Sequence, residues 1–124
     1  MIKRTAILWV ALSLPAQADG PSLGRVTNVV ITARHVTSGQ ECVGFKPTAR
    51  DVAKFLNAAM IITGEERHHG FSWSDCRVEG TARVGGRNAT WTMRALGTGE
   101  MTIYGAYSYI LADEKQRERS DIQP

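Results

Sequence analysis

The sequence predicts one small α+β domain, in which a single amphipathic helix covers an antiparallel sheet. Three observations lead to this fold class. Residues 25–37 are rich in Val, Ile and Thr without a helical period, residues 48–63 carry apolar side chains at helical spacing, and residues beyond 70 alternate with a period of two. A run of hairpins needs a cover for its apolar face, and the helix is the one element available to supply it.

The start of the chain has the features of a cleavable secretory signal. Two basic residues precede an apolar run over residues 6–14, and Ala16 and Ala18 fit the small-residue pattern of a cleavage site. The apolar run is about half of the roughly 20 residues that a membrane-spanning helix needs. We therefore expect residues 1–18 to be removed, which leaves a periplasmic or secreted protein without a membrane span.

Signal cleavage changes the charge balance. The whole chain has 15 Lys and Arg against 12 Asp and Glu, a formal net charge of +3 at pH 7. Loss of the two basic residues Lys3 and Arg4 lowers this net charge from +3 to +1. Nucleic-acid binders have a strong basic excess, so we expect no nucleic-acid partner.

The rest of the chain suits one domain over residues 19–112, followed by a charged, flexible tail over 113–124 that has little to bury. Cys42 and Cys76 are its two cysteines. Because exported proteins meet an oxidising environment, a Cys42–Cys76 disulfide is the favoured interpretation. A pair of buried free thiols is the alternative.

The helix is expected over residues 48–63. Thr48 is a suitable N-cap, and Asp51 places a carboxylate near the positive end of the helix dipole. Apolar side chains then recur at helical spacing, at Val52, Phe55, Leu56 and Ala59. Gly64 follows the last periodic residue and is the expected C-terminal cap.

A polar connection is expected over residues 65–70, followed by a three-stranded antiparallel meander. The strands are expected over residues 71–84, 89–96 and 101–111. The glycine-rich segments 85–88 and 97–99 are expected turns, because glycine supplies the positive φ angles that tight hairpins require. Gly105 is expected to be a bulge or bend within the last strand.

The order of strand, helix and meander across residues 25–111 resembles, in outline, the cystatin-like class of folds. The cystatin inhibitor signature Gln-x-Val-x-Gly is not matched by residues 40–44, because Cys42 stands where valine belongs. This segment also precedes the helix instead of lying in a hairpin. The resemblance therefore implies an arrangement of elements and no activity.

The sharpest group of candidate metal ligands or proton carriers is Glu65, Glu66, His68, His69 and Asp75. Adjacent histidines on an extended segment point in opposite directions, and the spacing matches no defined zinc motif. No nucleophile elbow of the form G-x-S-x-G occurs either. We expect no catalytic residue, metal or cofactor. The alternative function is a small periplasmic enzyme or metal-binding protein that uses His68, His69 and Asp75.

Aromatic and arginine side chains of the predicted strands suggest a protein-binding face. The candidates are Trp73, Arg77, Trp91, Arg94 and Tyr104, and side chains of these types are enriched at interfaces. Alternatively, both faces of the sheet are covered within the fold or by a second copy. The expected function is an exported, non-catalytic protein-binding module, such as an inhibitor, an immunity factor or an accessory subunit of an envelope or secretion assembly.

Overall fold

The computed structural model describes residues 23–37 and 39–117 of the 124-residue chain. The predicted signal peptide, residues 1–18, lies outside the described residues, as do residues 118–124 of the predicted tail. Within the described part, no helix is long and apolar enough to cross a membrane.

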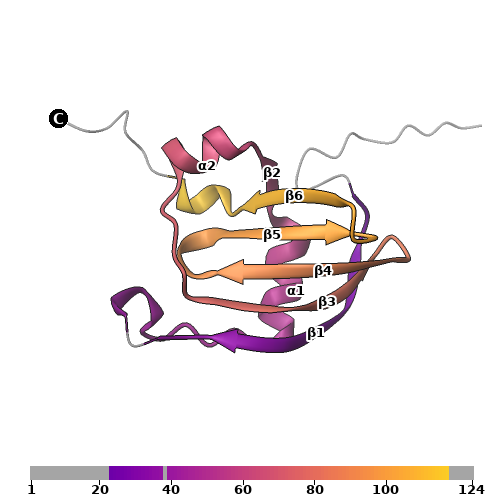
Figure 1. The fold of residues 1–124 in the computed structure, drawn as a ribbon, viewed down its shortest axis with the longest axis horizontal. Helices are drawn as coiled ribbons and strands as arrows, with labels where there is room; N and C mark the ends of the chain where they lie inside the picture. Colours follow the sequence, from indigo (N-terminus) through magenta and orange to yellow (C-terminus); the bar gives the residue numbers. More distant parts are fainter. Residues whose placement is uncertain (1–22, 38, 118–124) are drawn as a thin grey trace, which may run out of the picture.

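Six antiparallel strands form one sheet, and the longer helix crosses one of its faces (Figure 1). The strands are β1 (Val26–His35), β2 (Met60–Ile62), β3 (Arg77–Val84), β4 (Arg87–Arg94), β5 (Thr98–Ile103) and β6 (Tyr107–Ala112). Their spatial order is β1-β3-β4-β5-β6-β2. The helices are α1 (Ala49–Ala58) and α2 (Gly64–Gly70), with short 3-10 helices η1 (Gln40–Cys42), η2 (Ala95–Gly97) and η3 (Glu114–Gln116).

The predicted fold class is wrong in the number and length of its elements. A six-stranded sheet with two short helices stands where one strand, one long helix and a three-stranded meander were expected. The element order that suggested a cystatin-like outline is therefore not the observed one. Two local features account for most of the difference, the end of α1 and a hairpin hidden in the last predicted strand.

The helix α1 ends at Ala58, well before the predicted end at Thr63. The next residues form β2, which pairs with β6 at the edge of the sheet. Thr63 is instead the N-cap of α2: its hydroxyl accepts a hydrogen bond from Glu66 N at 3.0 Å, and the Glu66 carboxylate accepts one from Thr63 N at 2.8 Å. Gly64 therefore begins a helix instead of ending one, and the predicted polar connection is α2.

The predicted last strand is two strands, β5 and β6. Tyr104 and Gly105 have φ angles of 57° and 69°, and Ala106 N donates to Ile103 O at 3.0 Å. Two consecutive positive φ angles define a type I′ turn, which reverses the chain direction. Another boundary also differs from the prediction. The strand that was expected to begin at residue 71 begins at Arg77.

The core lies between α1 and the sheet. Val52 and Leu56 of α1 are fully buried against strand residues that include Val78, Met101, Ile103 and Leu111. Ile110 points to the other face, where its side chain lies 3.9 Å from the position that a Cβ on Gly64 of α2 would take. A small second cluster, Ile62, Phe71 and Ala112, is buried on that side.

Close contact between β1 and β3 depends on glycine. A Cβ on Gly80 would overlap the carbonyl oxygen of Val30 on β1, and it would lie 2.6 Å from Cζ2 of Trp91. The outer edge of β1 is capped by a side chain of α1. Asn57 accepts a hydrogen bond from Val26 N at 2.9 Å and donates one to Val26 O at 3.1 Å, which satisfies backbone groups that an edge strand leaves open.

Candidate functional site

The predicted disulfide is present and joins η1 to the residue before β3. The Cα atoms of Cys42 and Cys76 lie 5.6 Å apart, and both residues are buried. The described cysteines include no free thiol, so the alternative of two free thiols is wrong. Ala95 of η2 and Phe45 pack against the pair. The disulfide therefore fixes the loop after β1 to the end of the sheet where β4 ends.

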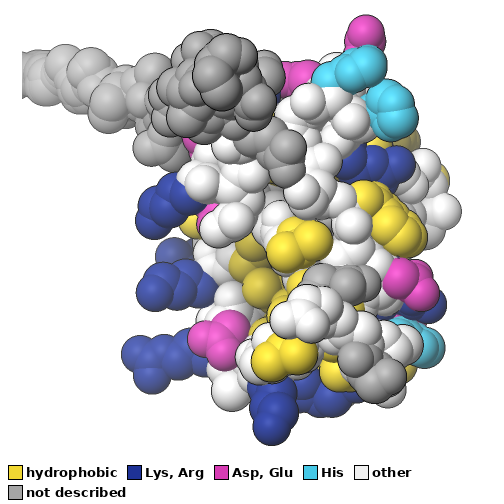
Figure 2. Space-filling model, turned by 90° about the vertical axis from the view of Figure 1, so that its left-hand side faces the viewer, with side chains coloured by type: hydrophobic (Ala, Val, Ile, Leu, Met, Phe, Trp, Pro, Cys, Tyr) yellow, Lys and Arg dark blue, Asp and Glu magenta, His cyan; other side chains and the backbone are white. Residues whose placement is uncertain are grey.

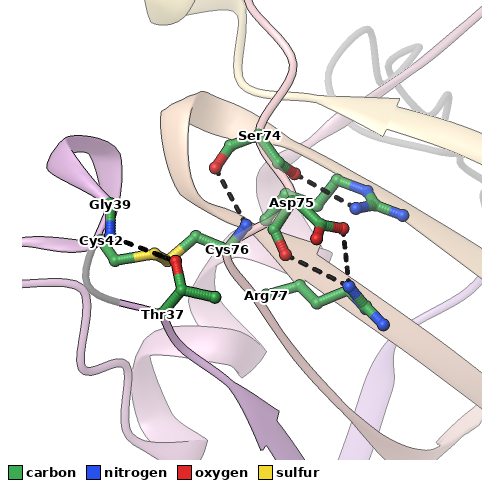
Figure 3. Close-up of a disulfide and its surroundings, with 8 residues drawn as sticks. Thr37, Gly39, Cys42, Ser74, Asp75, Cys76 and Arg77 are labelled. Carbon is green, nitrogen blue, oxygen red and sulfur yellow. Dashed lines mark hydrogen bonds and ion pairs between the residues drawn. A yellow bond between two sulfur atoms is a disulfide. The ribbon is translucent and has the colours of Figure 1, made fainter.

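Hydrogen bonds hold the irregular segment that precedes β3 (Figure 3). The buried Ser74 hydroxyl accepts a hydrogen bond from Cys76 N at 3.0 Å, and Cys76 O accepts one from Ala95 N at 2.9 Å. On the other side of the disulfide, the Thr37 hydroxyl lies 3.5 Å from Cys42 Sγ and accepts a hydrogen bond from Gly39 N at 3.1 Å. These contacts give the disulfide end a defined shape.

Four exposed apolar side chains lie around this disulfide: Val36, Val43, Trp73 and Leu96, with exposed fractions of 45, 74, 53 and 43%. Each is next in the chain to a residue of the disulfide region. Val36 precedes Thr37 and Val43 follows Cys42, whereas Trp73 precedes Ser74 and Leu96 follows Ala95. Figure 2 views this end of the molecule and shows hydrophobic side chains at its centre. We call these four residues the disulfide-end surface.

Leu96 has an unfavourable backbone conformation for an apolar residue. Its φ and ψ angles are 73° and 12°, in the left-handed region. A side chain with a Cβ is disfavoured there, whereas glycine and asparagine adopt the conformation readily. The leucine is also 43% exposed, so burial offsets only part of this cost. Folding alone does not explain why leucine occupies this position.

Trp73 is held in place by Arg94. The guanidinium carbon lies 4.6 Å from the centroid of the indole ring, and Arg94 Nη1 donates to Ser74 O at 3.1 Å. Arg94 Nε also donates to Glu100 of β5 at 3.0 Å, and Arg67 of α2 lies 3.6 Å from the same carboxylate. The exposed tryptophan is therefore fixed by groups from β4, β5 and α2.

Arg77, at the start of β3, belongs to another group of paired charges, separate from the ion pairs of Glu100. Its guanidinium pairs with Asp75 at 2.8 Å and with Glu79 at 2.9 Å, and His35 of β1 lies 3.5 Å from Glu79. The hydrogen bond from Arg77 lowers the pKa of the Glu79 carboxyl, against a smaller opposing effect of burial. A carboxyl held ionised in this way is suited to a fixed polar rim and unsuited to general acid catalysis.

The structure does not bring all five predicted binding residues together. Trp91 belongs to the core, is 2% exposed and donates from Nε1 to Thr81 O at 2.8 Å. Tyr104 is exposed, but its amide bonds to Asn88 O near the start of β4, whereas Arg94 ends that strand. Along a strand this separation is about 20 Å. Trp73, Arg77 and Arg94 therefore share one end of the molecule, and Tyr104 lies at the other.

The three candidate metal ligands lie on two separate segments. His68 and His69 are exposed in the last turn of α2, with their ring centroids 4.8 Å apart, and Asp75 pairs with Arg77. Among residues 23–37 and 39–117, no group of three or more His, Cys, Asp or Glu side chains is arranged to hold a metal ion.

Sequence reasoning missed three members of the disulfide-end surface, Val36, Val43 and Leu96. The available signal was the position of Val43 beside Cys42 in a predicted irregular connection, where an apolar side chain has little to pack against. Leu96 gave no such signal, because it fell in the alternation of a predicted strand.

Comparisons with family models, curated proteins and solved structures found no match for this chain.

Proposed function

We propose that the chain is an exported, non-catalytic protein-binding module that docks through the disulfide-end surface. Its role is that of an inhibitor, an immunity factor or an accessory subunit of an envelope or secretion assembly. Export is supported by the signal-like residues 1–18 and by the Cys42–Cys76 disulfide. The observation that carries the docking proposal is the exposed Leu96 side chain on a left-handed backbone.

The disulfide-end surface has the layout of a protein interface. Its apolar side chains lie beside charged groups that are already paired, Asp75, Arg77 and Glu79. Interfaces commonly combine an apolar centre with a polar rim, and tryptophan is among their strongest anchors. Trp73 is fixed by Arg94 before any partner arrives. Binding then costs little side-chain entropy, which favours affinity.

Because the backbone conformation at Leu96 is unfavourable for leucine, a substitution there can distinguish an effect on binding from an effect on stability. Asparagine tolerates the left-handed conformation, so Leu96→Asn should leave the fold as stable as before or slightly more stable. The same substitution removes an exposed apolar contact. A variant that keeps its melting temperature but loses its partner would show that leucine serves binding.

The experiment isolates the partner from envelope extract and compares variants for affinity and melting temperature. Leu96→Asn and Trp73→Ala should each weaken binding about tenfold or more, as expected for interface anchors. Tyr104→Asn is the matched control, because it relieves the same backbone strain at the opposite end of the molecule. It should leave affinity unchanged. Weakening by Tyr104→Asn with no effect of Leu96→Asn would refute the proposed surface.

A further inference from the structure

Positive charge collects at the end of the sheet opposite the disulfide. The turns between β3 and β4 and between β5 and β6 project together at this end, away from α2 and η3 (Figure 1). The segments that form it, residues 23–30, 81–90 and 101–109, contain three arginines and no Asp or Glu. The acidic side chains that the structure describes lie on or beside α1, α2 and η3, or toward the disulfide end of β3 and β5. We call these three segments the turn end.

Two of the arginines have guanidinium groups that are held at the β3–β4 turn by neutral acceptors. Arg83 donates to Gly86 O, and Arg87 donates to Val84 O at 3.2 Å, so both groups bond to carbonyls of the same turn. Each also donates to a second neutral oxygen, at 2.8 Å for Arg83 and 2.6 Å for Arg87. Among residues 23–37 and 39–117, no carboxylate lies within 4.0 Å of either group. A guanidinium has five N–H groups, so each keeps donors for an anion.

Arg25 adds a third positive charge beside the same turn. Its carbonyl oxygen accepts a hydrogen bond from Gly85 N at 3.1 Å, so the start of β1 lies against the turn, and its side chain is exposed. In the described part of the chain, this arginine has no carboxylate within 4.0 Å either. Three arginines without a local counter-charge give the turn end a positive potential, which attracts an anionic partner.

Two exposed tyrosines flank the neighbouring turn. Tyr104 and Tyr107 enclose the β5–β6 turn and are 61% and 60% exposed. Tyr104 and Arg83 line one hollow of about 570 Å³, so the aromatic and the positively charged side chains belong to one surface. The large apolar side chains exposed at the two described turns are these tyrosines, without the aliphatic centre that is common in protein interfaces. Tyrosine is enriched where lipid headgroups meet water, because its ring is apolar and its hydroxyl polar.

We propose that the turn end docks on an anionic phospholipid surface, with its arginines on lipid phosphates and its tyrosines at the level of the headgroups. Two turns that project to the same side can meet a flat surface together. Arginine and tyrosine without an aliphatic centre favour this surface over an acidic protein. The contact is peripheral and does not depend on the proposed protein docking. It would leave the disulfide-end surface, at the opposite end, free to meet a protein.

Co-sedimentation of the purified chain with lipid vesicles tests the proposal. Vesicles of equimolar phosphatidylglycerol and phosphatidylcholine should bind at least about tenfold more tightly than vesicles of phosphatidylcholine alone, because an anionic surface attracts each arginine. Added salt should weaken this binding, since it screens exposed charges. Equal binding to both kinds of vesicle, or none to the anionic one, would overturn the proposal. Binding of soluble polyglutamate without binding of anionic vesicles would assign the turn end to an acidic protein instead.

Paired variants locate the contact. Arg83→Gln together with Arg87→Gln should weaken binding to the anionic vesicles about tenfold or more, since each arginine near such a surface contributes about fivefold. Arg34→Gln together with Arg50→Gln removes the same charge from exposed positions outside the turn end. This control pair should change binding by less than about twofold, because solvent ions screen distant charges. Equal weakening by both pairs would show that net charge, and not the turn end, determines binding.

Single variants complete the test, with the melting temperature reporting on the fold. Arg25→Gln changes an exposed side chain outside the turn itself and should weaken vesicle binding about fivefold, even if the Arg83 and Arg87 pair unfolds the domain. Tyr104→Ser should also weaken it, because it removes an aromatic ring from the headgroup level. Leu96→Asn, in the disulfide-end surface, should leave vesicle binding unchanged. Loss of vesicle binding in Leu96→Asn, or full binding by Arg25→Gln and Tyr104→Ser, would contradict docking through the turn end.

Discussion

The guanidinium group of Arg94 lies over the ring of Trp73 and joins it to Glu100. The distance from the guanidinium carbon to the ring centroid is 4.6 Å, and Arg94 Nε donates to the Glu100 carboxylate at 3.0 Å. One side chain from the end of β4 thereby connects an irregular segment to the neighbouring strand β5. This explains how a tryptophan that is 53% exposed keeps one position.

Arg94→Ala should therefore release Trp73 and destabilise the domain by about 2 kcal/mol, since hydrogen bonds to charged groups contribute about 1.5–3 kcal/mol each. Arg94→Lys should not restore stability, because an ammonium group cannot reproduce the planar contacts to the ring, the carboxylate and Ser74 O. Chemical denaturation and acrylamide quenching of Trp73 fluorescence measure the two effects, with Arg83→Ala as an exposed control. Unchanged quenching in Arg94→Ala would contradict the restraint.

The disulfide closes a loop with a sequence separation of 34 residues. Reduction, or replacement of both cysteines by alanine, should lower the free energy of unfolding by about 3–4 kcal/mol, mainly through greater freedom of the unfolded chain. Denaturation with and without reductant measures this loss. A change below 1 kcal/mol, about the size of an ordinary surface effect, would show that the disulfide end is held by its other contacts.

Gly80→Ala should be among the most damaging single changes to the sheet. A methyl group at this position would overlap Val30 O and press on Trp91, so β1 would have to separate from β3. We expect a loss of about 3 kcal/mol or more, as for other severe steric changes. Gly64→Ala is the matched control. Its Cβ would meet only Ile110 Cδ1 at 3.9 Å, so we expect little change in the free energy of unfolding.

The alternation and helical spacing of apolar residues located the strands of the β3–β4 hairpin and the start of α1, but not the chain reversals between other elements. Ile62 continues the helical spacing of Phe55 and Ala59 and also suits a strand, and β2 forms because β6 offers an open edge. That pairing partner is distant in sequence. Local periodicity could not reveal it.

The sequence pattern did not reveal the hairpin between β5 and β6, for a different reason. Ile103 pairs with Tyr107 across the turn, so both side chains keep the phase of a single continuous strand. The turn itself has Tyr104 where asparagine is the usual residue before glycine, which weakened its signal. Trp91 was misplaced for a related reason: alternation defines two faces of a strand without saying which face α1 covers.

Stability should fall at acidic pH partly through Glu79. Its pKa is lowered in the folded state by Arg77, so its contribution is present above the unfolded pKa and is lost as the pH falls through the folded pKa. Between about pH 5 and about pH 3, Glu79→Gln should therefore lose less stability than the unchanged protein. Urea denaturation across this range measures the difference. An identical slope in both proteins would show that the pairing with Arg77 does not stabilise the fold.

Site-specific photo-crosslinking in the producing cell tests the docking surface most directly. A photoreactive phenylalanine analogue replaces Val43, which is 74% exposed in the disulfide-end surface, or Tyr107, which is 60% exposed at the other end. The two positions are similarly accessible, so unspecific collisions should label both alike. The proposed function predicts a discrete protein adduct from position 43 that Leu96→Asn diminishes, and no such adduct from position 107. An adduct from position 107 alone, or none from either position, would contradict docking through the disulfide end.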